Sequence, residues 1–83
     1  MEQAKETLLR EALAAVQHEI WAHWMRYVFK ICDTDDYGNV IITENLVNRW
    51  HDQINTSYAN LSEKEKDSDR EQADKVLEVL KNG

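Results

Sequence analysis

The chain has 83 residues, a formal net charge of −6, one cysteine and no proline. A chain this short makes a single domain that buries only about 60–65% of its unfolded surface, and no intrachain disulfide can reinforce it. The negative charge argues against general nucleic-acid binding, which needs a basic surface, and no segment approaches the ~18 apolar residues of a membrane span.

The first residues are acidic and polar, whereas a signal peptide begins with basic and then apolar residues. The single cysteine, Cys32, is typical of a protein from a reducing compartment. We therefore expect a cytoplasmic protein without a membrane partner.

Residues 3–31 predict one uninterrupted helix, because no glycine or proline breaks the segment. The helix would be roughly 42 Å long, whereas a compact domain of this size is about 30 Å across. Its apolar stripe consists of Leu9, Leu13, Val16, Ile20, Trp24 and Ile31. The half of the helix that overhangs the domain carries Leu8, Leu9, Ala12, Leu13 and Val16. We therefore expect a homo-oligomer that covers these residues.

An acidic loop is expected at residues 32–42. Four acidic residues lie within a stretch of twelve that has no Lys or Arg: Asp33, Asp35, Asp36 and Glu44. Residues 33–44 fit part of the EF-hand calcium loop, with aspartates at positions 1 and 3, glycine at position 6 and glutamate at position 12. Tyr37 and Ile41 depart from the pattern at positions 5 and 9. Two interpretations stay open: a plain surface loop, or a weak calcium site whose ligands are Asp33, Asp35 and Glu44.

Two more helices are expected after this loop. Thr43 can cap a helix over residues 43–55. Ser62 and Glu65 form a capping-box pattern, which predicts a helix over residues 62–82 that ends at Gly83. The sequence thus predicts one all-α domain, residues 1–83, with three helices and a long N-terminal one.

The histidines and the cysteine give little sign of catalysis. His18 and His23 stand five residues apart, about 140° around a helix, whereas the zinc-protease helix needs histidines at i and i+4. Cys32 and His51 add no recognised ligand spacing. We therefore predict that the protein is not an enzyme and has no catalytic residues or cofactor.

Aromatic and charged residues give the best candidate for a binding site. The apolar stripe of the last helix, Ala73, Val76, Leu77 and Leu80, extends backward to Asp69 and Lys66, which predicts that these two charges point inward beside the aromatics. This cluster is either an internal hydrogen-bond network or the lining of a pocket for a planar, charged ligand such as a nucleotide. The candidate ligand-binding residues are Trp21, Trp24, Arg49, Trp50, Tyr58, Lys66, Asp69 and Arg70.

Two sequence blocks resemble the ryanodine-receptor repeat domain, which also occurs as short bacterial and phage proteins. The first block is His18-Glu19-x-Trp21, and the second is Tyr58-x-x-Leu61-x-Glu63-x-Glu65-Lys66-x-x-Asp69-Arg70. The chain is also similar to small phage or prophage proteins in which a stretch like Arg49-Trp50-x-x-Gln53-x-x-Thr56-x-Tyr58 precedes the second block. The similarity spans roughly residues 18–80, but the repeat's own middle segments are absent.

This resemblance implies a non-catalytic helical module that binds a small ligand. For prokaryotic members the implied ligand is a nucleotide-derived signal, and a phage copy would sequester that signal to disarm host immunity. The alternatives from the residues themselves are a calcium-binding helix–loop–helix and an acidic inhibitor of a nucleic-acid-binding enzyme.

Overall fold

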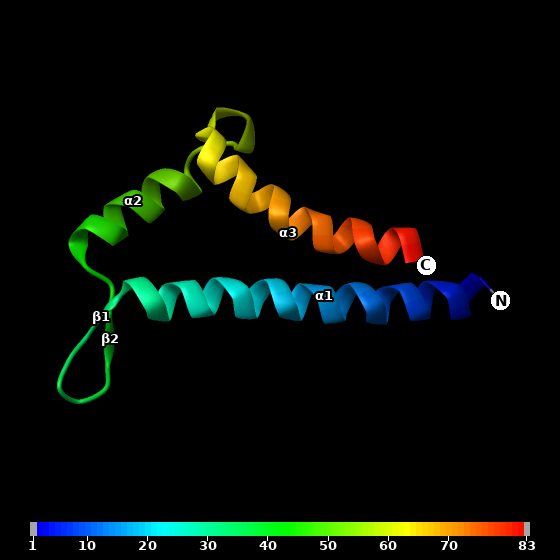
Figure 1. Cartoon of the computed structure of the whole chain (residues 1–83), viewed down its shortest axis with the longest axis horizontal. Helices are drawn as coiled ribbons and strands as arrows, with labels where there is room; N and C mark the ends of the chain where they lie inside the picture. Colours follow the sequence, from blue (N-terminus) through cyan, green and yellow to red (C-terminus); the bar gives the residue numbers. More distant parts are fainter. Residues whose placement is uncertain (1, 83) are drawn as a thin grey trace.

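A computed structural model describes residues 2–82 of the chain. Three helices dominate it: α1 (Glu2–Ile31), α2 (Glu44–Ile54) and α3 (Glu63–Asn82), with a short 3-10 turn, η1 (Tyr58–Asn60), before α3 (Figure 1). A two-stranded antiparallel hairpin, β1 (Asp33–Thr34) and β2 (Val40–Ile41), joins α1 to α2. The prediction of an all-α, three-helix chain with a long N-terminal helix is confirmed. Gly83, the expected end of the last helix, lies outside the described residues.

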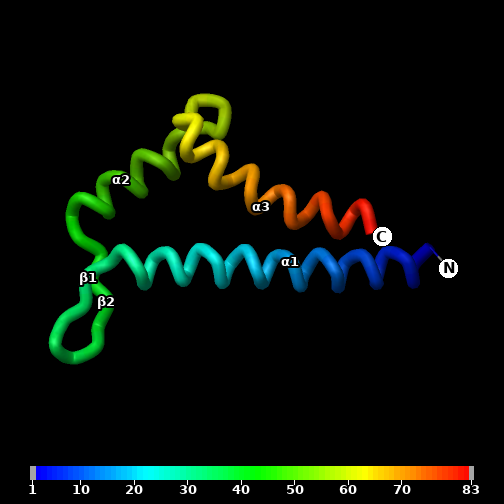
Figure 2. Tube along the Cα trace, in the orientation of Figure 1, coloured from blue at the N-terminus to red at the C-terminus, as the bar shows by residue number. Residues whose placement is uncertain are grey.

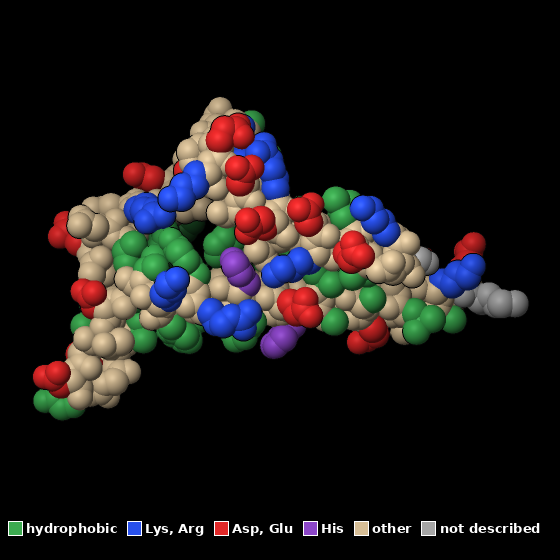
Figure 3. Space-filling view, viewed as in Figure 1, with side chains coloured by type: hydrophobic (Ala, Val, Ile, Leu, Met, Phe, Trp, Pro, Cys, Tyr) green, Lys and Arg blue, Asp and Glu red, His purple; other side chains and the backbone are tan. Residues whose placement is uncertain are grey.

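The helices trace an open triangle rather than a compact bundle. Helix α1 is its long side, α2 leaves from the C-terminal end of α1, and α3 runs back antiparallel toward the N-terminal half of α1 (Figure 2). A hollow is visible between the helices in Figure 3. The radius of gyration is 16.8 Å and the molecule measures 53 × 35 × 17 Å, whereas a compact domain of this length has a radius near 12 Å. Little of the chain is therefore packed on itself.

The buried core is correspondingly small. Of the described residues, only Val16 and Cys32, each 8% exposed, and Gln72 are buried. Val16 belongs to α1 and Gln72 to α3, the two helices that make the main long-range packing contact. Gln72 is not left unpaired, because its Oε1 accepts a hydrogen bond of 2.9 Å from Lys75 Nζ. Burial of this amide side chain is therefore compensated.

Helix α3 covers more of the apolar surface of α1 than we predicted from the lengths of the helices. Its 20 residues span roughly 30 Å and lie beside the N-terminal half of α1 (Figure 1). Val16 is therefore buried and Leu13 is half-buried, although both were expected to need a second copy to cover them. Leu8 and Leu9 do stay exposed, as expected.

The predicted buried face of α3 is only partly correct, because Lys66 and Val76 are half-buried but other members of it are exposed. The side chains of Asp69, Ala73, Leu77 and Leu80 are exposed, whereas Gln72 is buried and its neighbours Lys75, Val76 and Val79 are half-buried. The prediction assumed that the most apolar stripe of α3 would face the rest of the chain. Helix α3 packs chiefly against α1. Val76 of the predicted stripe is half-buried and Leu80 lines the groove between the two helices, whereas Asp69, Ala73 and Leu77 are turned to solvent.

The start of α3 follows the predicted capping box. The backbone N–H of Glu65 donates to Ser62 Oγ at 3.2 Å, and Ser62 Oγ donates to the Glu65 carboxylate at 2.8 Å. Thr43, at the corresponding position of α2, has extended backbone angles but makes no capping bond with its side chain. The Thr43 carbonyl instead accepts the first helical hydrogen bond, from Val47 N at 2.9 Å.

These two N-cap positions form a matched pair for mutation. We expect Ser62→Ala to lower the free energy of unfolding by about 1 kcal/mol, because one backbone donor loses its partner. Thr43→Ala should cost only a few tenths of a kcal/mol, because no side-chain capping bond is lost. Urea unfolding followed by far-UV circular dichroism measures both. Equal effects of the two substitutions would contradict this account of the cap.

Candidate functional site

The eight candidate ligand-binding residues do not gather into one pocket. Trp21 is exposed on α1, where its ring lies 5.6 Å from that of His18. Trp24 and Arg49 both contact Tyr27, and Trp50 lines a separate shallow depression. The other four belong to η1 and α3: Tyr58, Lys66, Asp69 and Arg70. Of the two charges predicted to point inward beside the aromatics, Lys66 is half-buried against Tyr58 but Asp69 is exposed.

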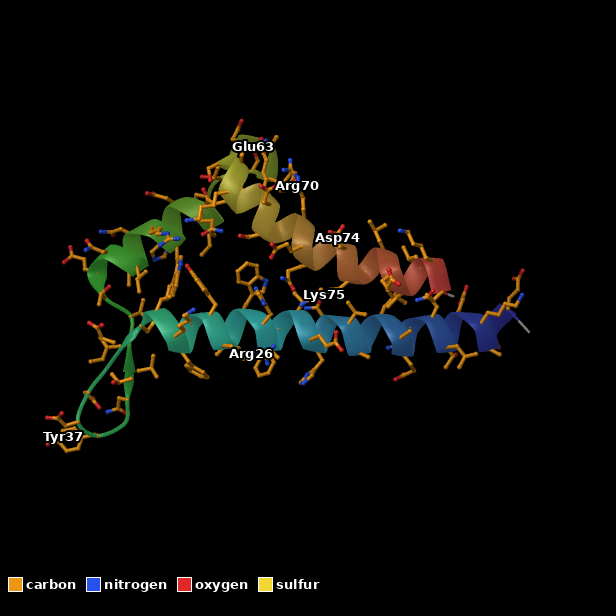
Figure 4. The ribbon with its side chains drawn as sticks, viewed as in Figure 1. Arg26, Tyr37, Glu63, Arg70, Asp74 and Lys75 are labelled. Atoms are coloured by element: carbon orange, nitrogen blue, oxygen red, sulfur yellow. The ribbon has the colours of Figure 1, made fainter. Side chains whose placement is uncertain are left out.

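The tightest polar cluster lies at the corner where η1 meets α3. Arg70 Nε donates to the Tyr58 hydroxyl at 3.1 Å, and Arg70 Nη1 donates to Glu63 at 3.1 Å and to Asp67 at 2.7 Å. Lys66 Nζ lies 5.8 Å from the centre of the Tyr58 ring and 3.7 Å from Glu63. The carboxylate of Asp67, then that of Glu63, and then the Tyr58 hydroxyl raise the pKa of Arg70 above its ordinary value. Figure 4 shows Glu63 and Arg70 together at this corner.

This cluster fixes how the chain turns from η1 into α3, and the positive charge of Arg70 is already paired within it. An anionic ligand at the Arg70 guanidinium would have to compete with two carboxylates of the same helix. The sequence did contain the necessary signal, because Glu63 and Asp67 stand seven and three residues before Arg70 on one helix face. Glu63 and Asp67 are therefore structural members of this corner that were not among the predicted residues.

A second contact joins α1 to α2 near their shared end. Arg49 Nη2 donates to the Tyr27 hydroxyl at 3.4 Å, and the Tyr27 ring packs edge-on at 6.0 Å from Trp24. Trp24 also meets His23 edge-on at 4.8 Å. His23, Trp24 and Tyr27 all belong to α1, so these ring pairs lie within one helix and hold the Tyr27 ring in place. Arg49 is therefore the residue that ties α2 to α1.

The acidic loop is a β-hairpin closed by its own hydrogen bonds. Asp35 Oδ1 accepts from the backbone N–H groups of Tyr37 and Asn39 at 2.9 and 2.8 Å, and Asp35 Oδ2 accepts from Asn39 Nδ2 at 2.8 Å. These hydrogen bonds, with those of Asn39 the largest, lower the pKa of Asp35. Gly38 adopts φ 84°, which a glycine tolerates without strain. Asp35 therefore stabilises the turn.

The calcium alternative lacks a ligand cluster in this arrangement. Asp33 lies in β1, opposite Ile41, and Glu44 begins α2. Across residues 2–82, no three or more His, Cys, Asp or Glu side chains converge as a metal site would require. The plain surface loop, the other interpretation, needs no such convergence.

A larger groove than the depression around Trp50 lies elsewhere, between α1 and α3. It has a volume of about 910 Å³, and its floor is apolar: Leu8, Leu9, Ala12 and Val16 from α1, with Val79 and Leu80 from α3. Charged side chains stand along both rims: Lys5 and Glu19 on α1, and Lys75 and Glu78 on α3. The depression around Trp50 is smaller, about 200 Å³, and is lined by Ile42, Val47, His51 and Ile54. None of the eight candidate residues lines the larger groove.

Comparison with protein-family models, with curated proteins and with solved structures finds no match to this chain. The resemblance to the ryanodine-receptor repeat domain therefore stays a prediction. None of the helices between residues 2 and 82 has an apolar stretch long enough to cross a lipid bilayer.

The corner cluster can be tested as a structural clamp. We expect Arg70→Ala to lower the melting temperature, because the Tyr58 hydroxyl and two carboxylates lose their shared donor. Arg26→Ala, on the exposed face of α1, is the control and should leave it unchanged. A panel of nucleotides, including cyclic and ADP-ribose-derived species, should not stabilise either form in a thermal-shift assay. Stabilisation of the wild type that disappears in Arg70→Ala would instead identify the corner as a nucleotide site.

Proposed function

We propose that the protein is a non-catalytic binding module that works as a homo-oligomer. The observation that carries this proposal is its surface area. The chain exposes 7112 Å² for a mass of 9.8 kDa, whereas a compact monomer of that mass exposes about 5,160 Å². Each chain thus has a surplus of about 1,950 Å² over a compact monomer.

This surplus has the size of a stable protein interface. If two chains each buried it, the interface would cover roughly 3,900 Å², within the range of obligate homodimers. The open triangle of helices and the radius of gyration of 16.8 Å point in the same direction, because a chain with so little contact between its elements has little to stabilise it alone.

The exposed surface includes large apolar side chains of the kind that association between chains would bury. Large apolar side chains are exposed on α1 and α3, among them Leu8, Trp21, Phe29, Leu77 and Leu80. Leu8, Leu9 and Leu80 line one groove together, and apolar side chains that gather in this way are typical of interaction sites in soluble proteins. At about 25 cal/mol per Å² of apolar area, its burial would supply the free energy that the small core of Val16 and Cys32 does not.

The shifted pKa values of Asp35 and Arg70 come from hydrogen bonds that fix a turn and a helix corner at the surface. Sequestration of a nucleotide-derived signal, calcium binding and inhibition of a nucleic-acid-binding enzyme all stay predictions from the sequence. Of these, inhibition by protein–protein contact fits an exposed apolar surface best.

Sedimentation velocity at micromolar concentration tests the proposal. We expect a species of at least twice the 9.8 kDa chain mass, because the surplus surface would be buried between copies. Sedimentation as a single 9.8 kDa species from micromolar to high micromolar concentration would contradict self-association, and a hetero-partner would then have to cover the surface.

A further inference from the structure

The groove between α1 and α3 is the best candidate for the contact between copies. It is larger than the depression around Trp50, apolar side chains from both helices line it, and it lies where the N-terminal half of α1 and the C-terminal half of α3 run side by side (Figure 3). Leu8 lines it and is 72% exposed, so a large apolar side chain stands at its edge with little cover. A surface of this kind accepts the apolar face of another helix.

We propose that a second copy of the chain occupies this groove, with the two α1 helices packed antiparallel about a two-fold axis beside Ala12. This proposal rests on the proposed self-association and adds its location and geometry. The residues of the groove favour a second copy as the occupant, because Lys5 and Glu19 stand on one helix with opposite charges that a two-fold pairing brings together.

The sequence of α1 has the spacing that such a contact requires. Five residues at successive intervals of three, four, three and four form one straight face of the helix: Lys5, Leu8, Ala12, Ala15 and Glu19. This alternation is the pattern of helices that pack along a shared seam. Four of the five line the groove, and the fifth, Ala15, is exposed beside it. The small side chains in the middle allow the two helix axes to approach to about 8 Å.

A two-fold axis beside Ala12 makes this face complementary to itself. In an antiparallel pair centred on residue 12, Lys5 lies opposite the partner's Glu19, and Leu8 lies opposite the partner's Ala15. The symmetry repeats each pair, so that two ion pairs flank an apolar centre. A two-fold interface requires this self-complementarity, because the same patch meets itself.

The rim charges also favour a second copy over a strongly charged partner. The groove is rimmed by two cations, Lys5 and Lys75, and two carboxylates, Glu19 and Glu78. It is therefore neutral although the whole chain carries −6. Figure 4 shows Lys75 on the side of α3 that faces α1. A basic or acidic partner segment would meet like charge on one part of this rim, whereas an identical rim turned by 180° meets opposite charge.

Two substitutions with matched exposure locate the interface. Leu8 and Ile54 are 72% and 76% exposed, and only Leu8 lines the α1–α3 groove. We expect Leu8→Asp to raise the dissociation constant, measured by sedimentation equilibrium, on the order of 100-fold or more, because two apolar contacts are lost per dimer. Ile54→Asp should leave it unchanged. If neither substitution changes an oligomeric wild type, the groove is not the interface, although self-association stands. A monomeric wild type overturns both proposals.

Charge reversal tests the antiparallel pairing without removing apolar surface. Lys5→Glu and Glu19→Lys should each raise the dissociation constant roughly 2- to 30-fold, because every change affects both symmetric ion pairs. The double variant Lys5→Glu/Glu19→Lys should recover the wild-type value, since the reversed charges meet again across the axis. Recovery would support the two-fold pairing even if Leu8→Asp fails to fold. Additive losses in the double variant would overturn it.

Discussion

The antiparallel packing of α3 on α1 is the contact on which the rest of this structure depends. It buries Val16 on one helix and Gln72 on the other, and it brings the C-terminal half of α3 beside the N-terminal half of α1. The corner at η1 makes this return possible, because Arg70 ties Tyr58 to the first turns of α3. Helix α2 serves chiefly as the connection between the two, with Arg49 donating to Tyr27 on α1.

That contact is too small to complete a core. One helix packed against another leaves much of both circumferences exposed, and here the exposed part includes Leu8, Leu77 and Leu80. The chain has neither a disulfide nor, among its described residues, a metal cluster to compensate. On the self-association that we propose, a second copy would supply the missing apolar partner by the same physics that holds α1 and α3 together. Binding and folding would then be parts of one equilibrium, as in obligate homodimers.

Local signals in the sequence predicted the helices well. Ser62 and Glu65 place the start of α3, and the glycine of the acidic loop adopts the positive φ of a tight turn. Such features depend on neighbours within a few residues. The buried face of α3 could be predicted only in part in this way. The apolar stripe of Ala73, Leu77 and Leu80 is the natural core face of an isolated helix, yet it is exposed here, because what α3 packs against is decided by the return of the whole chain.

The candidate site shows the same limit. Tyr58, Lys66 and Arg70 are indeed neighbours. The positive charge of Arg70, however, is paired with Glu63 and Asp67, which were not among the predicted ligand-binding residues. Trp21, Trp24 and Trp50 are large aromatics that a small chain uses for different contacts, and they do not face a common space. The groove between α1 and α3 depends on residues nearly 70 positions apart, such as Leu9 and Val79. No pattern among neighbouring residues of the sequence predicts this groove.

The most direct test of this account is the dependence of thermal stability on protein concentration. If the fold is completed by a second copy, unfolding releases two chains, and mass action raises the melting temperature with concentration. For two chains of this length the rise should be on the order of 4 °C for each tenfold increase in concentration. Calorimetry or circular dichroism from the low micromolar to the high micromolar range measures it. A melting temperature that does not change over this range would contradict the claim that association completes the fold.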